Sequence, residues 1–304
     1  MLDVLSKALS FVFIILLGYG FKKLKLFSPT DYKIIVKIVT NTTLPAAVIT
    51  SFATLQFEAS LLLITLMGLG INCCMLFVGF LVSRNKPKYE QALYALCMPG
   101  YNIGAFALPY AQGFLGATAA GVCALFDTGN AIMCTGGSCA VTDALLNRTE
   151  GKNIDLKQMS KNLLKSTPFV IYTAMLLITL IGIRIPLGVV DFISPIAAAN
   201  PYVAMLMIGM MFELDPEPSK LKTIGTIVII RNIVGIALAL MCYFLLPLPL
   251  VARQALCVLV FAPPSVLTPA FTEKCGGDGA LASCITSICI LTAIMGMTTV
   301  LMLF

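Results

Sequence analysis

The feature that most limits the fold of this chain is a succession of long apolar segments separated by short polar ones. A helix crosses the hydrocarbon core of a bilayer with about 20 apolar residues. Windows of that length predict ten spans, centred near Leu16, Ala46, Ile71, Asn102, Gly129, Leu176, Ala204, Leu238, Pro263 and Cys289. With 59% hydrophobic and 11% charged residues, the chain has more apolar surface than a soluble core buries. We therefore predict an all-α, polytopic membrane protein.

Lysine and arginine predict the orientation of these spans, because cytoplasmic loops retain basic residues. Alternate loops hold sixteen of the 20 basic residues: Lys22, Lys23, Lys25, Lys33, Lys37, Arg84, Lys86, Lys88, Arg148, Lys152, Lys157, Lys161, Lys165, Lys220, Lys222 and Lys274. The bias predicts a plasma-membrane protein with both termini on the outer side. It also accounts for the net charge of +6 without a nucleic-acid partner.

The two halves of the chain share a spacing pattern. Gln-Ala-Leu at 91–93 precedes Pro99 and Gly116, and Gln-Ala-Leu at 254–256 precedes Pro263 and Gly277. Five spans per half is an odd number, so the second half enters the membrane from the opposite side, as in inverted-repeat transporters. The predicted parts are a first repeat (1–146), a short amphipathic cytoplasmic linker (147–166) and a second repeat (167–304). Chance similarity between apolar segments is the alternative.

Proline interrupts the fourth and ninth spans at matching places, at 98–104 and 262–268. Such breaks free backbone groups that hydrocarbon does not tolerate unless protein or a polar cavity surrounds them. Paired breaks in repeated halves indicate a substrate site, and the N-termini of the half-helices that follow attract anions. The candidate binding residues here are Pro99, Gly100, Tyr101, Asn102, Gly104, Pro263, Pro264 and Ser265. Simple kinks are the alternative interpretation.

Polar residues in other spans extend the candidate site. Asn41 and Thr42 precede Pro45, which removes a helical hydrogen bond near them, and Asn200 is their counterpart in the seventh span. The alternative for this group is hydrogen bonding between helices.

Two charged residues lie inside spans, where each costs about 2.5–3.5 kcal/mol to insert. Their presence there needs an explanation. Asp127 lies in the fifth span, together with Asn130, and Arg231 lies in the eighth at a similar depth. Either the two charges form a fixed ion pair, or Arg231 faces an anionic substrate while Asp127 is a polar or proton-linked group. Both interpretations remain open.

Catalytic and metal chemistry find little support. The chain has no histidine, and its 11 cysteines include no C-x-x-C pair. It also lacks an ATP-binding G-x-x-x-x-G-K-[ST] loop. We expect no catalytic residues, no metal site and no cofactor. A coupled ion stays open: a proton through Asp127, or sodium through Thr42, Thr43, Ser265 and Thr268.

Several short motifs, in order along nearly the whole chain, resemble those of the auxin efflux carrier family. They are Asn-Thr-Thr-Leu-Pro at 41–45, Tyr-Asn-Ile-Gly-Ala-Phe-Ala-Leu-Pro at 101–109, Phe-Asp-Thr-Gly-Asn at 126–130, Met-Leu-Met-Ile-Gly-Met at 205–210 and Ala-Pro-Pro at 262–264. That family includes bacterial malate and malonate permeases and is related to the sodium and bile acid symporters.

The resemblance implies ten helices in an inverted repeat, with the fourth and ninth helices unwound and crossing beside the substrate. Pro99, Asn102, Pro263 and Pro264 match the crossover positions. It also implies an elevator-type motion, often within a homodimer. The third span lacks the charged pair of plant members and has Asn72 as its one strongly polar residue, which argues against auxin itself as the substrate.

These observations favour a secondary active or facilitative carrier of a small organic anion, a mono- or dicarboxylate of the auxin or malate type. The expected partners are that anion, the lipid bilayer and a second copy of the chain. A membrane ligand sensor with a transporter fold, a sodium-coupled symporter of a larger amphipathic anion and an intramembrane enzyme are the alternatives. The enzyme hypothesis has no supporting motif.

Overall fold

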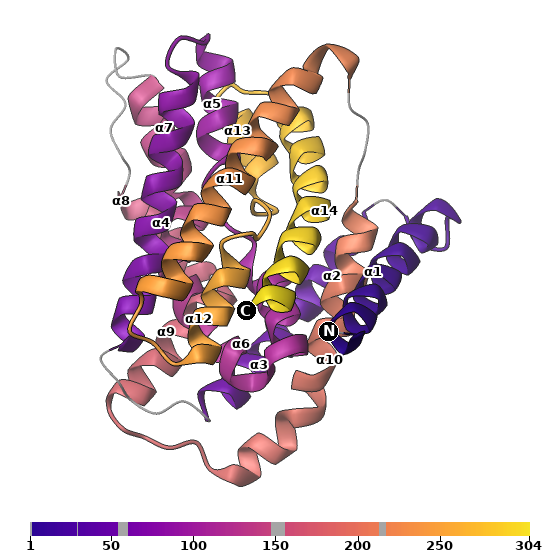
Figure 1. The fold of residues 1–304 in the computed structure, drawn as a ribbon, viewed down its shortest axis with the longest axis vertical. Coiled ribbons are helices and arrows are strands. Elements are labelled where there is room, and N and C mark those ends of the chain that lie inside the picture. Colours follow the sequence, from indigo (N-terminus) through magenta and orange to yellow (C-terminus); the bar gives the residue numbers. More distant parts are fainter. Residues whose placement is uncertain (1, 29, 54–59, 147–155, 213–216) are drawn as a thin grey trace.

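The protein is a bundle of helices without a β-strand across the residues described by the computed structural model, which are 2–28, 30–53, 60–146, 156–212 and 217–304 (Figure 1). The prediction of an all-α fold is confirmed. The α-helices are α1 (Leu2–Lys23), α2 (Tyr32–Ile38), α3 (Leu44–Phe52), α4 (Ser60–Ser83), α5 (Lys88–Cys97), α6 (Leu108–Ile132), α7 (Ser138–Leu146), α8 (Leu156–Lys165), α9 (Thr167–Leu180), α10 (Leu187–Met211), α11 (Leu221–Leu245), α12 (Leu250–Leu259), α13 (Thr268–Lys274) and α14 (Gly279–Leu303). The π-helical turns η1 (Val39–Thr43), η2 (Ile103–Ala107) and η3 (Met133–Gly137) and the 3-10 turn η5 (Pro218–Lys220) join some of them.

Seven helical segments of the described chain are long and apolar enough to cross a bilayer, and α8 with α9 make an eighth if this bent pair is one span. By helix length and composition alone, the structure has fewer spans than the ten that were predicted. The interruptions explain part of the difference, because α5 and α12 have 10 residues each and α13 has 7. A helix of 10 residues is about 15 Å long, half of the hydrocarbon thickness.

The long segment from η2 to α7 accounts for another part of the difference. It has 44 residues and counts as one candidate span, although a straight helix of that length would measure about 66 Å. The backbone leaves helical geometry at Gly116, with φ 81° and ψ −167°. Glycine takes such positive φ values without a steric penalty, so α6 is broken at this residue.

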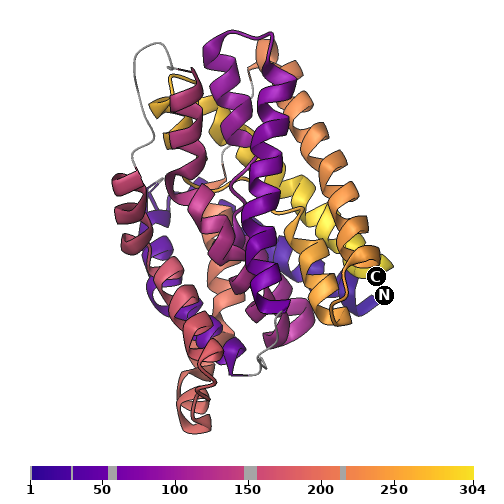
Figure 2. The same ribbon diagram turned by 90° about the vertical axis from the view of Figure 1, so that its left-hand side faces the viewer.

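The helices pack as two groups. We call α1, α2, α3, α9 and α10 the panel, and α4 to α7 with α11 to α14 the core bundle. Within the panel α10 lies against α1 and α3, and within the core bundle α6 lies against α4 and α12. The two groups meet where α3, α9 and α10 contact α6. Figures 1 and 2 show that α9 and α10 of the panel extend beyond the core bundle at one end of the molecule.

Glycines let the main helix pairs approach closely. A Cβ built on Gly209 of α10 would lie 2.0 Å from the carbonyl oxygen of Ile15 in α1. A Cβ built on Gly129 of α6 would lie 2.0 Å from the carbonyl oxygen of Thr65 in α4. Small residues at helix contacts are typical of membrane proteins, where association depends on close packing.

The outer surface is apolar, as expected for a protein whose solvent is lipid. Phe13, Ile229 and Met295, on three different helices, are all more than half exposed. Soluble monomers rarely expose apolar surface so extensively.

Candidate functional site

The two segments interrupted by proline lie against each other inside the core bundle. After α5 and after α12, the backbone forms no regular helix for several residues before the next helical turn begins. Tyr101 and Pro264 form an antiparallel β-bridge at this point. Pro99 and Pro263 are buried beside it. The breaks therefore form a single crossing point, which we call the crossing.

Backbone hydrogen bonds hold the crossing together from both sides. The N–H of Asn102 donates to the carbonyl of Pro263 over 2.8 Å, and the N–H of Ser265 donates to the carbonyl of Gly100 over 2.5 Å. Gly100 has φ 75°, the left-handed region that glycine favours. Each interrupted segment thus satisfies polar groups that the other has freed.

Arg231 of α11 binds the carbonyl ends of both interrupted helices. Its guanidinium donates to the carbonyls of Cys97 (2.8 Å) and Met98 after α5, and to the carbonyl of Ala262 (2.7 Å) after α12. It also lies 5.1 Å from the ring centre of Tyr101. The last carbonyls of a helix carry its negative dipole end, so this charge compensates two helix ends at once.

Two amide side chains fix the first interrupted segment in place. Asn130 accepts from the N–H of Tyr101 (3.1 Å) and donates to its carbonyl (2.8 Å). Asn72 donates to Asn130 (2.9 Å) and accepts from the N–H of Gly100 (2.6 Å). Asn130 also donates to Asp127 (2.7 Å). Both amides are fully buried, and they connect the crossing with Gly68 of α4 and Asp127 of α6.

Asp127 faces the start of η2 and not Arg231. The backbone N–H of Gly104 donates to its carboxylate. A Cβ built on Gly104 would lie 3.2 Å from Asp127 Oδ2 and 2.7 Å from the Tyr172 hydroxyl. Among the described residues, no ion pair joins Asp127 with Arg231. The fixed ion pair considered for these two charges is therefore absent.

The side chain of Asn102 is available at the crossing. It is 9% exposed, and within the described chain its amide forms no hydrogen bond, although its backbone does. Ser265 on the other segment accepts from the N–H of Leu267 over 3.2 Å, and its hydroxyl also contacts the thiol of Cys134. A buried amide normally has partners, so Asn102 is the group best placed to bind a ligand.

Among the described residues, neither Asn41 nor Thr42 forms a side-chain hydrogen bond to the crossing, although η1 packs against η2. Both side chains are exposed on η1, where Asn41 accepts from the Thr167 hydroxyl (2.7 Å) and Thr42 donates to a carbonyl of its own helix (2.5 Å). The buried neighbour Thr43 instead donates to Asn200 (3.0 Å). This bond is the hydrogen bonding between helices that was the alternative for this group; it does not test Asn200 as the counterpart of the motif in the second repeat. A substrate role for Asn41 and Thr42 stays a prediction.

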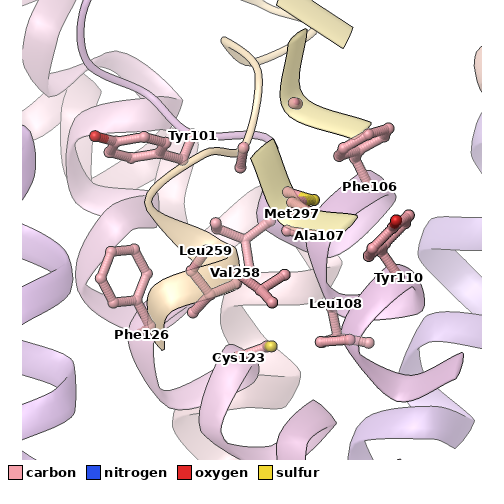
Figure 3. Close-up of a cluster of buried hydrophobic side chains, with 14 of the residues drawn as sticks. Tyr101, Phe106, Ala107, Leu108, Tyr110, Cys123, Phe126, Val258, Leu259 and Met297 are labelled. Carbon is pink, nitrogen blue, oxygen red and sulfur yellow. The ribbon is translucent and has the colours of Figure 1, made fainter. Parts of the chain in front are cut away.

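Apolar side chains pack around the crossing (Figure 3). Tyr101 contacts Phe126 edge to face, with ring centres 6.4 Å apart. Val258, Leu259 and Met297 are buried in the same cluster. This packing keeps the interrupted backbone in a dry environment, which strengthens its hydrogen bonds.

A small cavity adjoins Arg231 on the side of α14. It offers about 10 Å³ to the centre of a water-sized sphere, which is room for about one water molecule. Its lining consists of Arg231, Asn232, Val260, Phe261, Ala262, Cys289 and Thr292. The cavity is too small for an organic anion. Among the described residues, no three His, Cys, Asp or Glu side chains gather as metal ligands.

Two residues of this site were not among the sequence candidates. Asn72 was noted only as the polar residue of its span, and its position in an apolar helix was the available signal. Tyr172 gave no signal, because tyrosine is common in membrane helices. The first part of the predicted cytoplasmic linker, residues 147–155, lies outside the described residues.

A family model described as membrane transport protein matches residues 3–302. None of the curated proteins matches the chain.

Proposed function

The chain belongs to the membrane transport protein family, and on that premise we propose that it is a carrier of a small organic anion. The family agrees with the auxin efflux carrier motifs in the sequence. The observation that carries the proposal is the crossing, where two interrupted helices are locked together and Asn102 keeps its amide free. A carboxylate of the substrate accepts from that amide and from the hydroxyl of Ser265.

Arg231 holds the site in shape without meeting the anion. Its guanidinium is 7% exposed and is bound to three carbonyls. Each helix C-terminus carries about half a negative charge, so the two helix ends that Arg231 binds offset most of its positive charge. The donor for the anion, mono- or dicarboxylates included, is therefore the amide of Asn102.

Proton coupling through Asp127 is the version of the mechanism that the contacts favour. Asp127 has no cationic partner among the described residues and faces the half-helix that starts at Gly104. Sodium coupling would need Thr42 and Thr43 near Ser265, but those hydroxyls donate to a carbonyl of α2 and to Asn200. The Asp127 carboxylate can therefore take up and release the coupled proton.

We further propose ten crossings in an inverted repeat of two five-helix halves. The break at Gly116 divides the 44-residue segment: its first part, η2 with the start of α6, continues α5 as one interrupted crossing, and the rest of α6 with α7 makes the next. The second interrupted crossing is α12 with α13. The two chain ends lie close together in both views (Figures 1 and 2), which agrees with both termini on the outer side of the plasma membrane. The offset between panel and core bundle supports an elevator motion, with the panel as the static part and as the interface of a homodimer.

The test has two steps. A thermal-shift screen of the purified protein against small carboxylates, with and without sodium and at two pH values, identifies the ligand and the coupled ion. Uptake of that ligand into proteoliposomes is then measured for Asn102→Ala. We expect saturable uptake to be lost while the protein stays folded.

The matched control is Asn232→Ala, which removes an amide that donates to Val228 of its own helix. This variant should transport normally. Wild-type uptake by Asn102→Ala would refute the proposed site. Ligand binding without uptake by the wild-type protein would favour the sensor hypothesis.

A further inference from the structure

Helix α8 has an orientation unlike that of a membrane span. Its segment Met159–Lys165 is bent by 82° from Thr167–Leu180 of α9. Because α9 is apolar and belongs to the panel, a helix at nearly a right angle to it runs along the membrane surface. Basic helices in this orientation lie at the level of the lipid headgroups.

The two faces of α8 differ. Met159, Asn162 and Leu163 are half-buried, and the Asn162 amide donates to the carbonyl of Thr135 over 3.5 Å, which attaches the helix to η3. The opposite face is exposed and carries a row of lysines with a spacing of four residues, Lys157, Lys161 and Lys165. Residues four apart lie on the same side of a helix, so the three ammonium groups point in one direction.

Leu164 adds an apolar group to this basic face. It is 71% exposed and adjoins the lysine row. An exposed leucine next to lysines fits the boundary between headgroups and acyl chains, where lysine side chains extend toward the polar region.

A second row of lysines lies on α2. Lys33 and Lys37 are exposed and are also four residues apart. Asn41, one turn after Lys37, accepts from the Thr167 hydroxyl over 2.7 Å and thus connects this helix to the junction of α8 and α9. We call the two rows, five lysines on helices that this contact joins near their C-terminal ends, the lysine patch.

The lysine patch has no neutralising partner in the described chain. None of its five ammonium groups takes part in an ion pair among the described residues. The nearest acidic residue on α2 is Asp31, whose carboxylate accepts from the hydroxyl and the N–H of Ser28. The patch also lies on the side that the distribution of basic residues assigns to the cytoplasm, where anionic lipids are enriched.

We propose that the lysine patch binds the headgroups of anionic phospholipids and thereby fixes α8 to the membrane surface. Clusters of four to eight basic residues next to a span are typical of such recognition. The phosphates accept from the ammonium groups, and Leu164 inserts between the acyl chains. This inference is independent of the transported substrate.

The experiment uses the full-length protein in a neutral detergent, titrated with phosphatidylglycerol or with phosphatidylcholine. Retained lipid is counted by native mass spectrometry, which gives an apparent Kd. The test variant replaces Lys157, Lys161 and Lys165 by Gln, and we expect its Kd for phosphatidylglycerol to rise tenfold or more. The control replaces three exposed basic residues of the core bundle by Gln, Arg84, Lys88 and Lys222, and should leave the Kd within twofold of wild type.

Two further measurements separate lipid binding through charge from a loss of folding in the Gln variant. Replacing the same three lysines of α8 by Arg should preserve binding, and raising the salt concentration should weaken it in the wild-type protein. If the Gln variant does not fold, these two results decide the proposal. It is refuted by equal affinity for phosphatidylcholine, by a wild-type Kd in the Gln variant, or by inorganic phosphate competing at the lipid's own concentration, which would indicate a site for soluble anions.

Discussion

Arg231 should be more important for folding than for direct contact with substrate. Replacement by Met removes three hydrogen bonds from a charged donor, each worth about 1.5–3 kcal/mol. Part of that gain offsets the desolvation of the guanidinium, so the net loss is smaller than their sum. The carbonyls of Cys97, Met98 and Ala262 lose their partner, and a buried acceptor left unsatisfied costs about 1–3 kcal/mol.

The assay is thermal unfolding in detergent, followed by the reaction of a dye with buried thiols as they become exposed. Cys97 and Cys289 lie next to Arg231 and are suitable reporters, because both are buried. A loss of about 3 kcal/mol corresponds to a fall in Tm of about 5 °C, on the scaling of unfolding entropy with chain length for soluble proteins. Arg231→Lys should fall between wild type and Arg231→Met, since an ammonium group cannot span both helix ends in the way a planar guanidinium does.

The opposite result would refute this structural role of Arg231. If the guanidinium met the anion directly, Arg231→Gln would raise the apparent Kd tenfold or more, which is about 1.4 kcal/mol, and leave Tm unchanged. A structural role predicts the reverse: a lower Tm, together with a nearly unchanged Kd in the fraction that remains folded.

Two other predictions follow from contacts outside the crossing. Gly209→Ala should destabilise the panel by about 1–3 kcal/mol, because its Cβ would lie 2.0 Å from a backbone oxygen, whereas Gly70→Ala, with open space around it, should be neutral in the same unfolding assay. Asp278 caps α14 and accepts from Lys220, which holds the pKa of its carboxyl below the usual value near 4. Asp278→Ala should therefore cost about 1 kcal/mol at neutral pH. Because the pKa of Asp278 is lower in the folded than in the unfolded protein, its carboxylate stabilises the fold at pH values above the unfolded pKa. This stabilisation is lost as the pH falls through the folded pKa, so the difference in Tm between variant and wild type should shrink below about pH 4. A constant difference from neutral pH to about pH 3 would contradict the proposed charge effect.

Local sequence determined a large part of this protein. The apolar segments specify helices in a membrane, because only helices and closed barrels satisfy their backbone in lipid. Pro99 and Pro263 specify where two of these helices break, since proline removes a donor and clashes with the preceding turn. The glycines near the first break permit the positive φ that the interrupted chain requires at Gly100.

The tertiary structure decided which groups meet. The depth of Arg231 and Asp127 along their helices was readable from the sequence, but their direction around the helix axis and their neighbours were not. Packing turned Arg231 toward the carbonyl ends of α5 and α12 and Asp127 toward Gly104. It also selected Thr43 over Thr42 as the inward residue. The sequence shows that backbone groups freed in lipid need hydrogen-bonding partners. Which side chains become those partners depends on the packing of the helices, because only packing brings particular groups within hydrogen-bonding distance.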